Sequence, residues 1–418
     1  MIKKYIVAFS VLAAGGAAEA ADSFLPQSDV AQAAIGAHPV VAAAEASLAE
    51  AEAQARVYKA GDHDFHLSGS YIRRDVRGEG TYSEWDSTIS RAIRLPGKAK
   101  EDRKIGALGI NVAENARDDA RHQVALLLKD YWFEWLEAGA MHRIDQMAVD
   151  TYRQELQAVE RRYELQEAAL LEVEGVRSAL ATAAARLQKS QARKLEAERA
   201  IGTMFPTMAL PAQQLDIGDP AATEYGFDEW KNLILTRSHE LRMAEKYAEQ
   251  QMALARRGRL NKIADPTIGV RFFSERGGEE QGVGLLFSMP FGSSRRSAQS
   301  DARRARALAA EAQARQVRLM VEEVADRDIT RAEAGLSVWQ QASAALTASE
   351  QVVSRARRAV ELGERDLVEL LRALNAHHDV VRQEATARIA AHNAITQLRI
   401  DSHEIWIATH HDHEDHDD

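Results

Sequence analysis

The sequence predicts a mainly α-helical chain with four β-strands, and three observations predict this fold class. The eight prolines leave two long segments free of proline, 97–205 and 291–418, and both are rich in the stronger helix formers Ala, Arg, Glu, Gln and Leu. Two pairs of short segments alternate apolar and polar residues, which is the pattern of strands. The two halves of the chain repeat these features in the same order, which indicates one structural unit used twice.

The composition excludes several classes of protein. The 418 residues include 53 Lys and Arg against 63 Asp and Glu, which gives a formal charge of −10 and argues against a nucleic-acid partner. Because the chain has no cysteine, it has no disulfide framework, thiolate metal site, cysteine nucleophile or lipid-modified cysteine. A nucleotide-binding glycine loop, a nucleophile elbow and a His-Glu-x-x-His motif are all missing from the sequence. We therefore expect a protein that is not an enzyme and has no resident cofactor.

Residues 1–20 have the features of a signal peptide. Lys3 and Lys4 precede a short apolar run, and Ala18-Glu19-Ala20 provides the small-x-small pattern that signal peptidase recognises. We expect cleavage after Ala20 and export from the cytoplasm. A buried N-terminal helix is the alternative interpretation.

The remainder divides into two repeats. We place the first repeat at 21–201 and the second at 226–405, joined by a proline-containing segment at 202–225 and followed by a tail at 406–418. Matching landmarks are the Ala37-His38 and Ser238-His239 openings, the Pro96-Gly97 and Pro290-Phe291-Gly292 turns, and the Glu164–Glu172 and Glu361–Glu369 segments, at offsets of 201, 194 and 197. Each repeat is expected to contain a helix, a β-hairpin and a long helical hairpin.

The long helices have coiled-coil-like spacing. Apolar residues recur at alternating intervals of three and four, as in Tyr152, Leu156, Val159 and Tyr163. The run from Pro96 to about residue 165 corresponds to a helix of roughly 105 Å at 1.5 Å per residue. A helix of this length extends far beyond the thickness of a bilayer.

Each repeat contains one predicted hairpin. The alternating segments are 65–72 and 85–93 in the first repeat and 267–272 and 282–289 in the second, with polar, Gly-rich tips at 73–80 and 275–280. Segment lengths near nine to eleven residues suit transmembrane strands. Six aromatic residues are candidates for interface girdles: Tyr71, Tyr82, Trp85, Phe272, Phe287 and Phe291. Soluble hairpins with one buried face are the alternative.

Four transmembrane strands cannot close a barrel alone. An open strand edge in hydrocarbon leaves unpaired N–H and C=O groups, each costing several kcal/mol. We therefore expect a homotrimer in the outer membrane, in which three chains pool twelve strands in one β-barrel and their helices extend into the periplasm.

The repeated landmarks resemble those of the TolC family of outer-membrane efflux channels. The resemblance rests on the His38 and His239 openings, the turns after Pro96 and Pro290, and the Leu362–Leu371 turn. These landmarks follow one another in the same order in both repeats, and the resemblance covers essentially the whole mature chain. The nearest branch is that of the heavy-metal resistance-nodulation-division (RND) pumps of the cobalt–zinc–cadmium (CzcC-like) type. The resemblance implies an outer-membrane duct of a tripartite system that exports divalent heavy-metal cations.

The same resemblance implies the partners. They are outer-membrane lipid, a periplasmic adaptor (membrane fusion) protein and an inner-membrane RND transporter, and no nucleic acid. Two other functions stay open at this point. One is a periplasmic coiled-coil adaptor or metal-sequestering protein, and the other is a TolC-like duct for organic drugs.

Acidic residues near the two helical turns are candidates for a pore constriction. The resemblance places the constriction at Glu369 and Arg372, where the arginine departs from the acidic residue of the family. Glu172 occupies the matching place in the first repeat. In a trimer each glutamate forms a ring of three carboxylates, which attracts cations. An exposed glutamate on a helix face is the alternative.

The helix reversals are candidates for adaptor docking. The candidates are Leu165, Leu362 and Gly363, which lie at these reversals. We choose them because a tight turn favours glycine and because exposed apolar residues at a tip indicate a partner. The first turn has Gln166 where the second has Gly363, so the two tips need not be equivalent.

The tail is a candidate for weak metal chelation. Its four imidazoles belong to His410, His411, His413 and His416 and are interleaved with five carboxylates. This ligand set suits borderline divalent cations such as Zn, Co, Ni or Cd, although a solvated tail is the alternative. The adjacent pair His377 and His378 does not share a helix face, so a role in packing is favoured over metal ligation.

Overall fold

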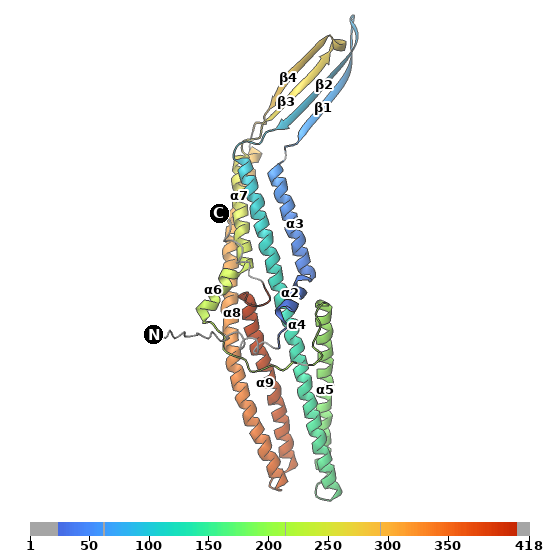
Figure 1. Cartoon of the computed structure of the whole chain (residues 1–418), viewed down its shortest axis with the longest axis vertical. Helices are drawn as coiled ribbons and strands as arrows, with labels where there is room; N and C mark the ends of the chain where they lie inside the picture. Colours follow the sequence, from blue (N-terminus) through green and yellow to red (C-terminus); the bar gives the residue numbers. More distant parts are fainter. Residues whose placement is uncertain (1–23, 62, 214, 293, 408–418) are drawn as a thin grey trace, which may run out of the picture. The chain divides into compact units, whose positions relative to one another are not determined.

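The computed structural model describes residues 24–407 except 62, 214 and 293. Its elements, in chain order, are α2 (Ser28–Gly36), α3 (Pro39–Ala60), β1 (Phe65–Val76), β2 (Gly80–Ala92), α4 (Lys98–Glu164), α5 (Leu170–Met204), α6 (Phe227–Arg237), α7 (His239–Leu260), β3 (Thr267–Glu275), the 3-10 turn η1 (Arg276–Gly278), β4 (Glu280–Ser288), α8 (Ser294–Glu361) and α9 (Leu367–Asp401) (Figure 1). The predicted signal peptide and residues 408–418 of the tail lie outside the described residues.

The chain forms two compact units, and each draws on both halves of the sequence. The helical unit comprises residues 24–39, 121–237 and 323–407, and the strand-bearing unit comprises 40–120 and 238–322. The long helices α4 and α8 contribute to both units. The units therefore do not coincide with the sequence repeats.

The strand-bearing unit contains one four-stranded antiparallel sheet in the order β1-β2-β3-β4. Each predicted hairpin is present, and the central strands β2 and β3 join the two hairpins through a register that pairs Ile89 with Val270. Gly78 and Gly80 adopt positive φ at the first tip, where residues with side chains are rarely found. The predicted combination of long helices and two hairpins is confirmed.

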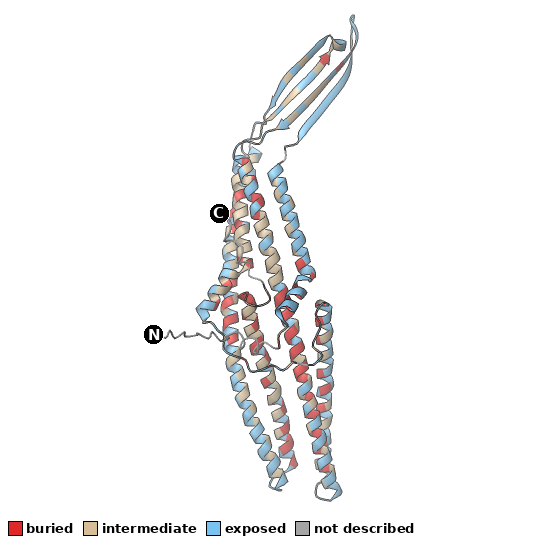
Figure 2. Cartoon of the chain, viewed as in Figure 1, coloured by how far each residue is buried: buried red, intermediate tan, exposed pale blue. Residues whose placement is uncertain are grey.

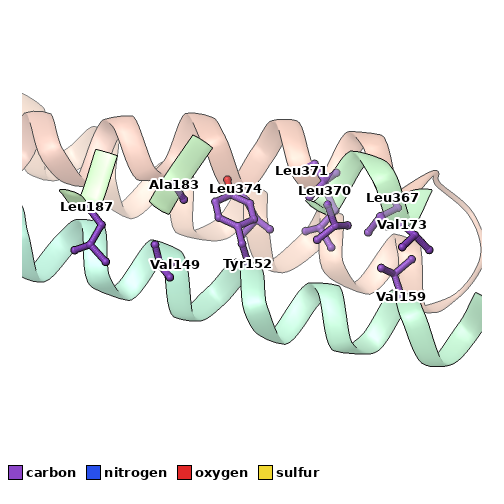
Figure 3. Packing of buried hydrophobic residues seen from close by; sticks show 11 residues of the cluster. Val149, Tyr152, Val159, Val173, Ala183, Leu187, Leu367, Leu370, Leu371 and Leu374 are labelled. Atoms are coloured by element: carbon purple, nitrogen blue, oxygen red, sulfur yellow. The ribbon is translucent and has the colours of Figure 1, made fainter. Parts of the chain in front are cut away.

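The helical unit is held together by a long apolar seam. Buried residues from α4, α5 and α9 form it, and α8 packs against it (Figure 3). The seam consists of Val149, Tyr152, Val159, Val173, Val176, Ala183, Leu187, Leu367, Leu370, Leu371 and Leu374. The spacing of three and four places these side chains on one stripe of each helix. The Tyr152 hydroxyl donates a 2.8 Å hydrogen bond to Asn375 Oδ1, so its polar end is satisfied inside the seam.

Burial differs between helices and strands. Buried residues run as stripes along the helices, whereas the strands are almost wholly exposed or half-buried (Figure 2). Within the described ranges, no helix combines the length and the apolarity needed to cross a bilayer.

Candidate functional site

One face of the sheet is apolar across all four strands. The register aligns Leu67 with Ile89, Ile89 with Val270 and Val270 with Leu285, so these side chains project from the same face. We call this the apolar face; its large residues are Phe65, Leu67, Tyr71, Trp85, Ile89, Ile268, Val270, Phe272, Val283, Leu285 and Phe287. Most of them are exposed, and Leu285 reaches 92% exposure. A continuous exposed apolar patch of this kind marks a surface that contacts a partner or a membrane.

The opposite face carries two cross-strand ion pairs. Asp86 accepts a 2.9 Å hydrogen bond from the Ser70 hydroxyl and lies 3.3 Å from the Arg271 guanidinium. Arg74 and Glu84 form a second ion pair on this polar face. The two faces therefore have opposite solvent preferences.

The register corrects one predicted girdle residue. Tyr82 pairs with Arg74, so it belongs to the polar face, and its hydroxyl contacts Glu79 near the tip. Tyr71 and Trp85 pair with each other on the apolar face, as the girdle prediction required. The girdle prediction was wrong for Tyr82 because this residue precedes the segment, 85–93, in which the alternation was assigned. On β2 its side chain projects from the same face as those of Glu84 and Asp86.

Aromatic residues occur at the base of the apolar face and farther toward its tip, and Phe272, which pairs with Val283, lies between these levels. Phe65 and Phe287 lie at the base, next to the helices, and Phe65 is covered by the Arg91 guanidinium at 4.7 Å. Tyr71 and Trp85 lie six residues along β1, about 20 Å farther at 3.3 Å per residue. The residues at the two ends fit the aromatic levels typical of transmembrane strands, whereas the predicted girdle residue Phe272 lies within the apolar band.

Both outer edges of the sheet lack a strand partner within the described chain. β1 pairs only with β2, and β4 pairs only with β3. Each edge therefore presents backbone N–H and C=O groups to another strand.

A buried ion network fastens the strands to the helices that follow and precede them. Asp265 accepts hydrogen bonds from Lys98 Nζ and from the Leu95 N–H, both at 2.9 Å, and contacts His63 at 3.2 Å. Burial alone raises the pKa of Asp265, but these donors lower the pKa below its ordinary value. Asp265 is therefore ionised at neutral pH and holds the base of both hairpins.

The first helical tip reverses the chain through two backbone hydrogen bonds. The N–H of Gln166 donates to the Tyr163 carbonyl at 3.0 Å, and the N–H of Glu167 donates to the Arg162 carbonyl at 2.8 Å. These are the two bonds of the Schellman motif. Gln166 has φ +62°, a conformation that L residues other than glycine rarely adopt.

The second tip has the same geometry with glycine in the critical place. Gly363 has φ +72° and donates to the Val360 carbonyl at 3.1 Å, and Glu364 donates to the Ala359 carbonyl at 2.9 Å. The tips are therefore alike in backbone and differ in conformational cost. Leu165 is 69% exposed and Leu362 is 55% exposed, so both predicted docking leucines face solvent in the single chain.

The predicted constriction residues have different local partners. The Glu172 carboxylate accepts a 2.9 Å hydrogen bond from the Ala169 N–H and so caps α5. Glu369 is exposed and forms a 3.1 Å ion pair with Arg365, one turn earlier. Arg372 is also exposed, one turn after Glu369. Of the two glutamates, Glu172 has a structural role and Glu369 is held only by an exposed pair.

Sequence reasoning missed a buried polar cluster in the helical unit. Asp145, which is 1% exposed, lies 3.1 Å from His378 Nε2 and 2.6 Å from Arg382. Burial raises the pKa of Asp145, yet hydrogen bonds from Ser190, Arg382 and His378 lower it below its ordinary value. Burial lowers the pKa of His378, against the opposing effect of Asp145. His377 instead contacts the Ser349 hydroxyl at 2.8 Å, so the two adjacent histidines have separate packing roles.

The cluster borders a polar cavity of about 560 Å³ between α4, α5 and α9. Its walls include both acidic and basic side chains, among them Glu134, Glu137, Arg186 and Arg193. A mixed lining of this kind does not select one sign of charge.

In the part of the chain that the structure describes, no three His, Asp or Glu residues are placed to hold a metal ion together. The four predicted tail ligands, His410, His411, His413 and His416, lie outside the described residues. Tail chelation therefore stays a prediction.

Comparison with solved structures identifies membrane proteins of the same fold. The outer membrane protein VceC from Vibrio cholerae matches with a TM-score of 0.73 and 16% identity, covering 90% of this chain and 95% of that chain. A membrane protein from Pseudomonas aeruginosa matches with a TM-score of 0.77 and 14% identity, covering 96% and 97%. The MtrE outer membrane channel of Neisseria gonorrhoeae, in its open state, matches with a TM-score of 0.62 and 14% identity, covering 90% and 88%. No family model and no curated protein sequence matches the chain.

These likenesses extend over nearly the whole of each chain. They confirm the fold class predicted from the sequence, long helices with four strands per chain. The chain therefore has the fold found in outer-membrane channels.

Proposed function

We propose that three copies of this chain form an outer-membrane duct for efflux, with its helices in the periplasm. The observation that carries the proposal is the apolar face, which continues across β1, β2, β3 and β4 while the polar face carries the ion pairs. This arrangement fits a strand wall with lipid outside and water inside. The solved structures of the same fold include proteins named as outer-membrane channels.

The free edges support the homotrimer. A single four-stranded sheet in lipid leaves two open edges, and every unpaired backbone group there costs several kcal/mol. Pairing β1 of one copy with β4 of the next satisfies both edges, and three copies close a wall of twelve strands.

The helical tips support a place in a tripartite system. Leu165 and Leu362 are exposed next to chain reversals, where a periplasmic adaptor can cover them. The adaptor in turn would connect the duct to an inner-membrane RND transporter. Substituting Gly363 by valine should weaken adaptor crosslinking and leave the trimer intact, whereas loss of the trimer would assign Gly363 to folding.

For the substrate we favour divalent heavy-metal cations over organic drugs. Three copies of Glu369 in a narrow duct raise the local cation concentration, and the tail adds four imidazoles and five carboxylates. Deleting the gene should sensitise cells to zinc, cobalt, nickel or cadmium more than to detergents and dyes, and the reverse pattern favours the drug duct. Deleting residues from His410 onward should lower metal binding without abolishing export.

Cell fractionation tests the duct against the other function class. A duct appears in the outer-membrane fraction as a trimer whose mobility in SDS changes on heating. A soluble periplasmic monomer would instead support the coiled-coil adaptor or metal-sequestering protein.

A further inference from the structure

The strand–helix junctions are strongly basic in a chain that is acidic overall. Four segments flank the base of the sheet, at 56–64, 93–104, 256–266 and 289–306. They contain sixteen Lys and Arg against six Asp and Glu, whereas the formal charge of the whole chain is −10. All four segments belong to the strand-bearing unit, and we call them the basic collar.

Three of the six acidic residues of the collar, Glu101, Asp102 and Asp265, form ion pairs within it. Asp102 pairs with Arg94 at 3.3 Å and with Arg257 at 2.6 Å, and Asp265 pairs with Lys98. Many basic side chains are exposed and have no side-chain partner among the described residues: Arg56, Lys59, Lys100, Arg103, Lys104, Arg259, Lys262, Arg295, Arg304 and Arg306. The collar therefore presents an excess of positive charge at its surface.

A groove of about 1040 Å³ joins this basic surface to the apolar face. Ile89, Val270 and Leu285 line its apolar part. Lys59 and Arg91 line the end next to the helices.

The two cations at that end are available to an anion. No described residue pairs with the Lys59 ammonium. Arg91 uses its Nε to donate a 2.7 Å hydrogen bond to the His63 carbonyl and stacks over Phe65, which fixes the guanidinium. Its two terminal nitrogens form no hydrogen bond or ion pair with the described chain. A held guanidinium and an unpaired ammonium that line one groove suit a phosphate group.

We propose that this groove binds an anionic phospholipid. The acyl chains lie along Ile89, Val270 and Leu285, and the phosphate lies between Lys59 and Arg91. The rest of the basic collar adds a longer-range attraction, because each basic residue near an anionic membrane surface strengthens the binding. The inference rests on the proposed function, since it requires lipid at the apolar face.

The groove and the collar together favour a lipid over other anions. A free phosphate would use the cations but not the apolar lining. A zwitterionic phospholipid would use the lining, but its own ammonium would offset the attraction to the collar. Only an anionic amphiphile satisfies both parts.

Native mass spectrometry of the detergent-solubilised trimer tests the proposal. Phosphatidylglycerol, phosphatidylcholine and inorganic phosphate are titrated in parallel against the wild type, the pair Lys59→Gln with Arg91→Gln, and a control pair. The control is Arg315→Gln with Arg355→Gln, two exposed arginines of α8 outside the collar.

We expect selective retention of phosphatidylglycerol that weakens with added salt. The Lys59/Arg91 pair should lower the affinity for phosphatidylglycerol roughly twenty-five-fold, from about five-fold for each charge removed. The control pair should leave it within about two-fold. Equal retention of phosphatidylcholine, or equal losses in both pairs, would overturn the proposal. Saturation by inorganic phosphate alone would also overturn it, because the site would then bind a free anion.

Two safeguards keep the failures distinguishable. Heat-dependent mobility in SDS is measured on every variant, and if the pair does not form a trimer, Lys59→Gln alone and the salt titration of the wild type decide. A wild-type trimer that inserts into bilayers but shows no lipid preference contradicts only this inference. A soluble wild-type monomer contradicts the proposed function itself.

Discussion

Two neighbouring leucines of β4 provide a matched test of which sheet face meets lipid. Leu285 pairs with Val270 on the apolar face, and Leu286 pairs with Gly269 on the polar face. Leu285 is 92% exposed and Leu286 is 39% exposed in the single chain. Replacing each in turn by arginine changes the same residue type on the same strand, so the two variants differ chiefly in the face that receives the charge.

The depth of each residue in the apolar band of the membrane determines how much free energy its replacement by arginine should cost. Leu285 lies three residues from the end of β4 at Ser288, about 10 Å along the strand and roughly 8 Å in height at a tilt near 40°. Val283 lies roughly 13 Å high, close to the middle of an apolar band about 25 Å tall. We expect Leu285→Arg to cost about 2 kcal/mol per chain and Val283→Arg about 2 to 4 kcal/mol. Leu286→Arg should cost less than about 1 kcal/mol, because the proposed duct places this side chain in water.

The assay is the unfolding free energy of the protein folded into phospholipid vesicles, measured by denaturant titration. The yield of heat-modifiable trimer in membranes gives a second readout. Equal costs for Leu285→Arg and Leu286→Arg would refute the assignment of the faces, and a larger cost for Leu286→Arg would reverse it.

The remaining predictions concern the helical unit. Gln166→Gly should stabilise the first tip by about 0.5 to 1 kcal/mol, and Gly363→Val should destabilise the second by about 1 to 2 kcal/mol, because only glycine adopts positive φ without strain. Hydrogen exchange of the tip amides measures both changes in stability. Changes of the opposite sign would contradict the tip geometry. Because burial lowers the pKa of His378 below 6.5, against the opposing effect of Asp145, the unfolded chain takes up a proton first as the pH falls. Stability should therefore drop from pH 7.5 to 5.5, and His378→Gln should flatten that drop in thermal unfolding; an unchanged slope would exclude His378 as its source. Glu369→Gln should lower the cation selectivity of the trimer in planar bilayers, whereas Glu172→Gln should mainly lower the stability of α5. Identical effects of the two variants on cation selectivity would remove the distinction between the two glutamates.

The sequence was sufficient for the elements and for both tips. Prolines and helix formers mark the long helices, and α4 ends at Glu164, one residue before the predicted reversal at Leu165. The period of two marks the strands, because an alternating burial pattern is a local property of the chain. The β2–β3 pairing was not predicted, since it joins segments from different halves and depends on their packing.

The buried cluster shows why part of the site escaped sequence reasoning. Asp145 and His378 are 233 residues apart, and nothing in the spacing around either residue indicates the contact. The sequence favoured a packing role for the adjacent His377 and His378 without distinguishing them, whereas the packing of α9 against α4 buries only His378. The usable signal was Asp145, a charged residue that lies four positions before Val149 in the apolar repeat of α4.

Disulfide trapping between strand edges is the most direct test of the central claim, that β1 of one copy pairs with β4 of the next. The chain contains no cysteine, so every crosslink reports the introduced pair. Ser68→Cys on β1 is combined in turn with Gly282→Cys, Gly284→Cys or Leu286→Cys on β4, which scans the unknown register between copies. Directly paired strand residues lie about 4.5 to 5.5 Å apart, within reach of a disulfide. We expect covalent trimers from one of these combinations in outer membranes and none from the single variants. Monomers throughout the scan would contradict the pairing of β1 with β4 between copies.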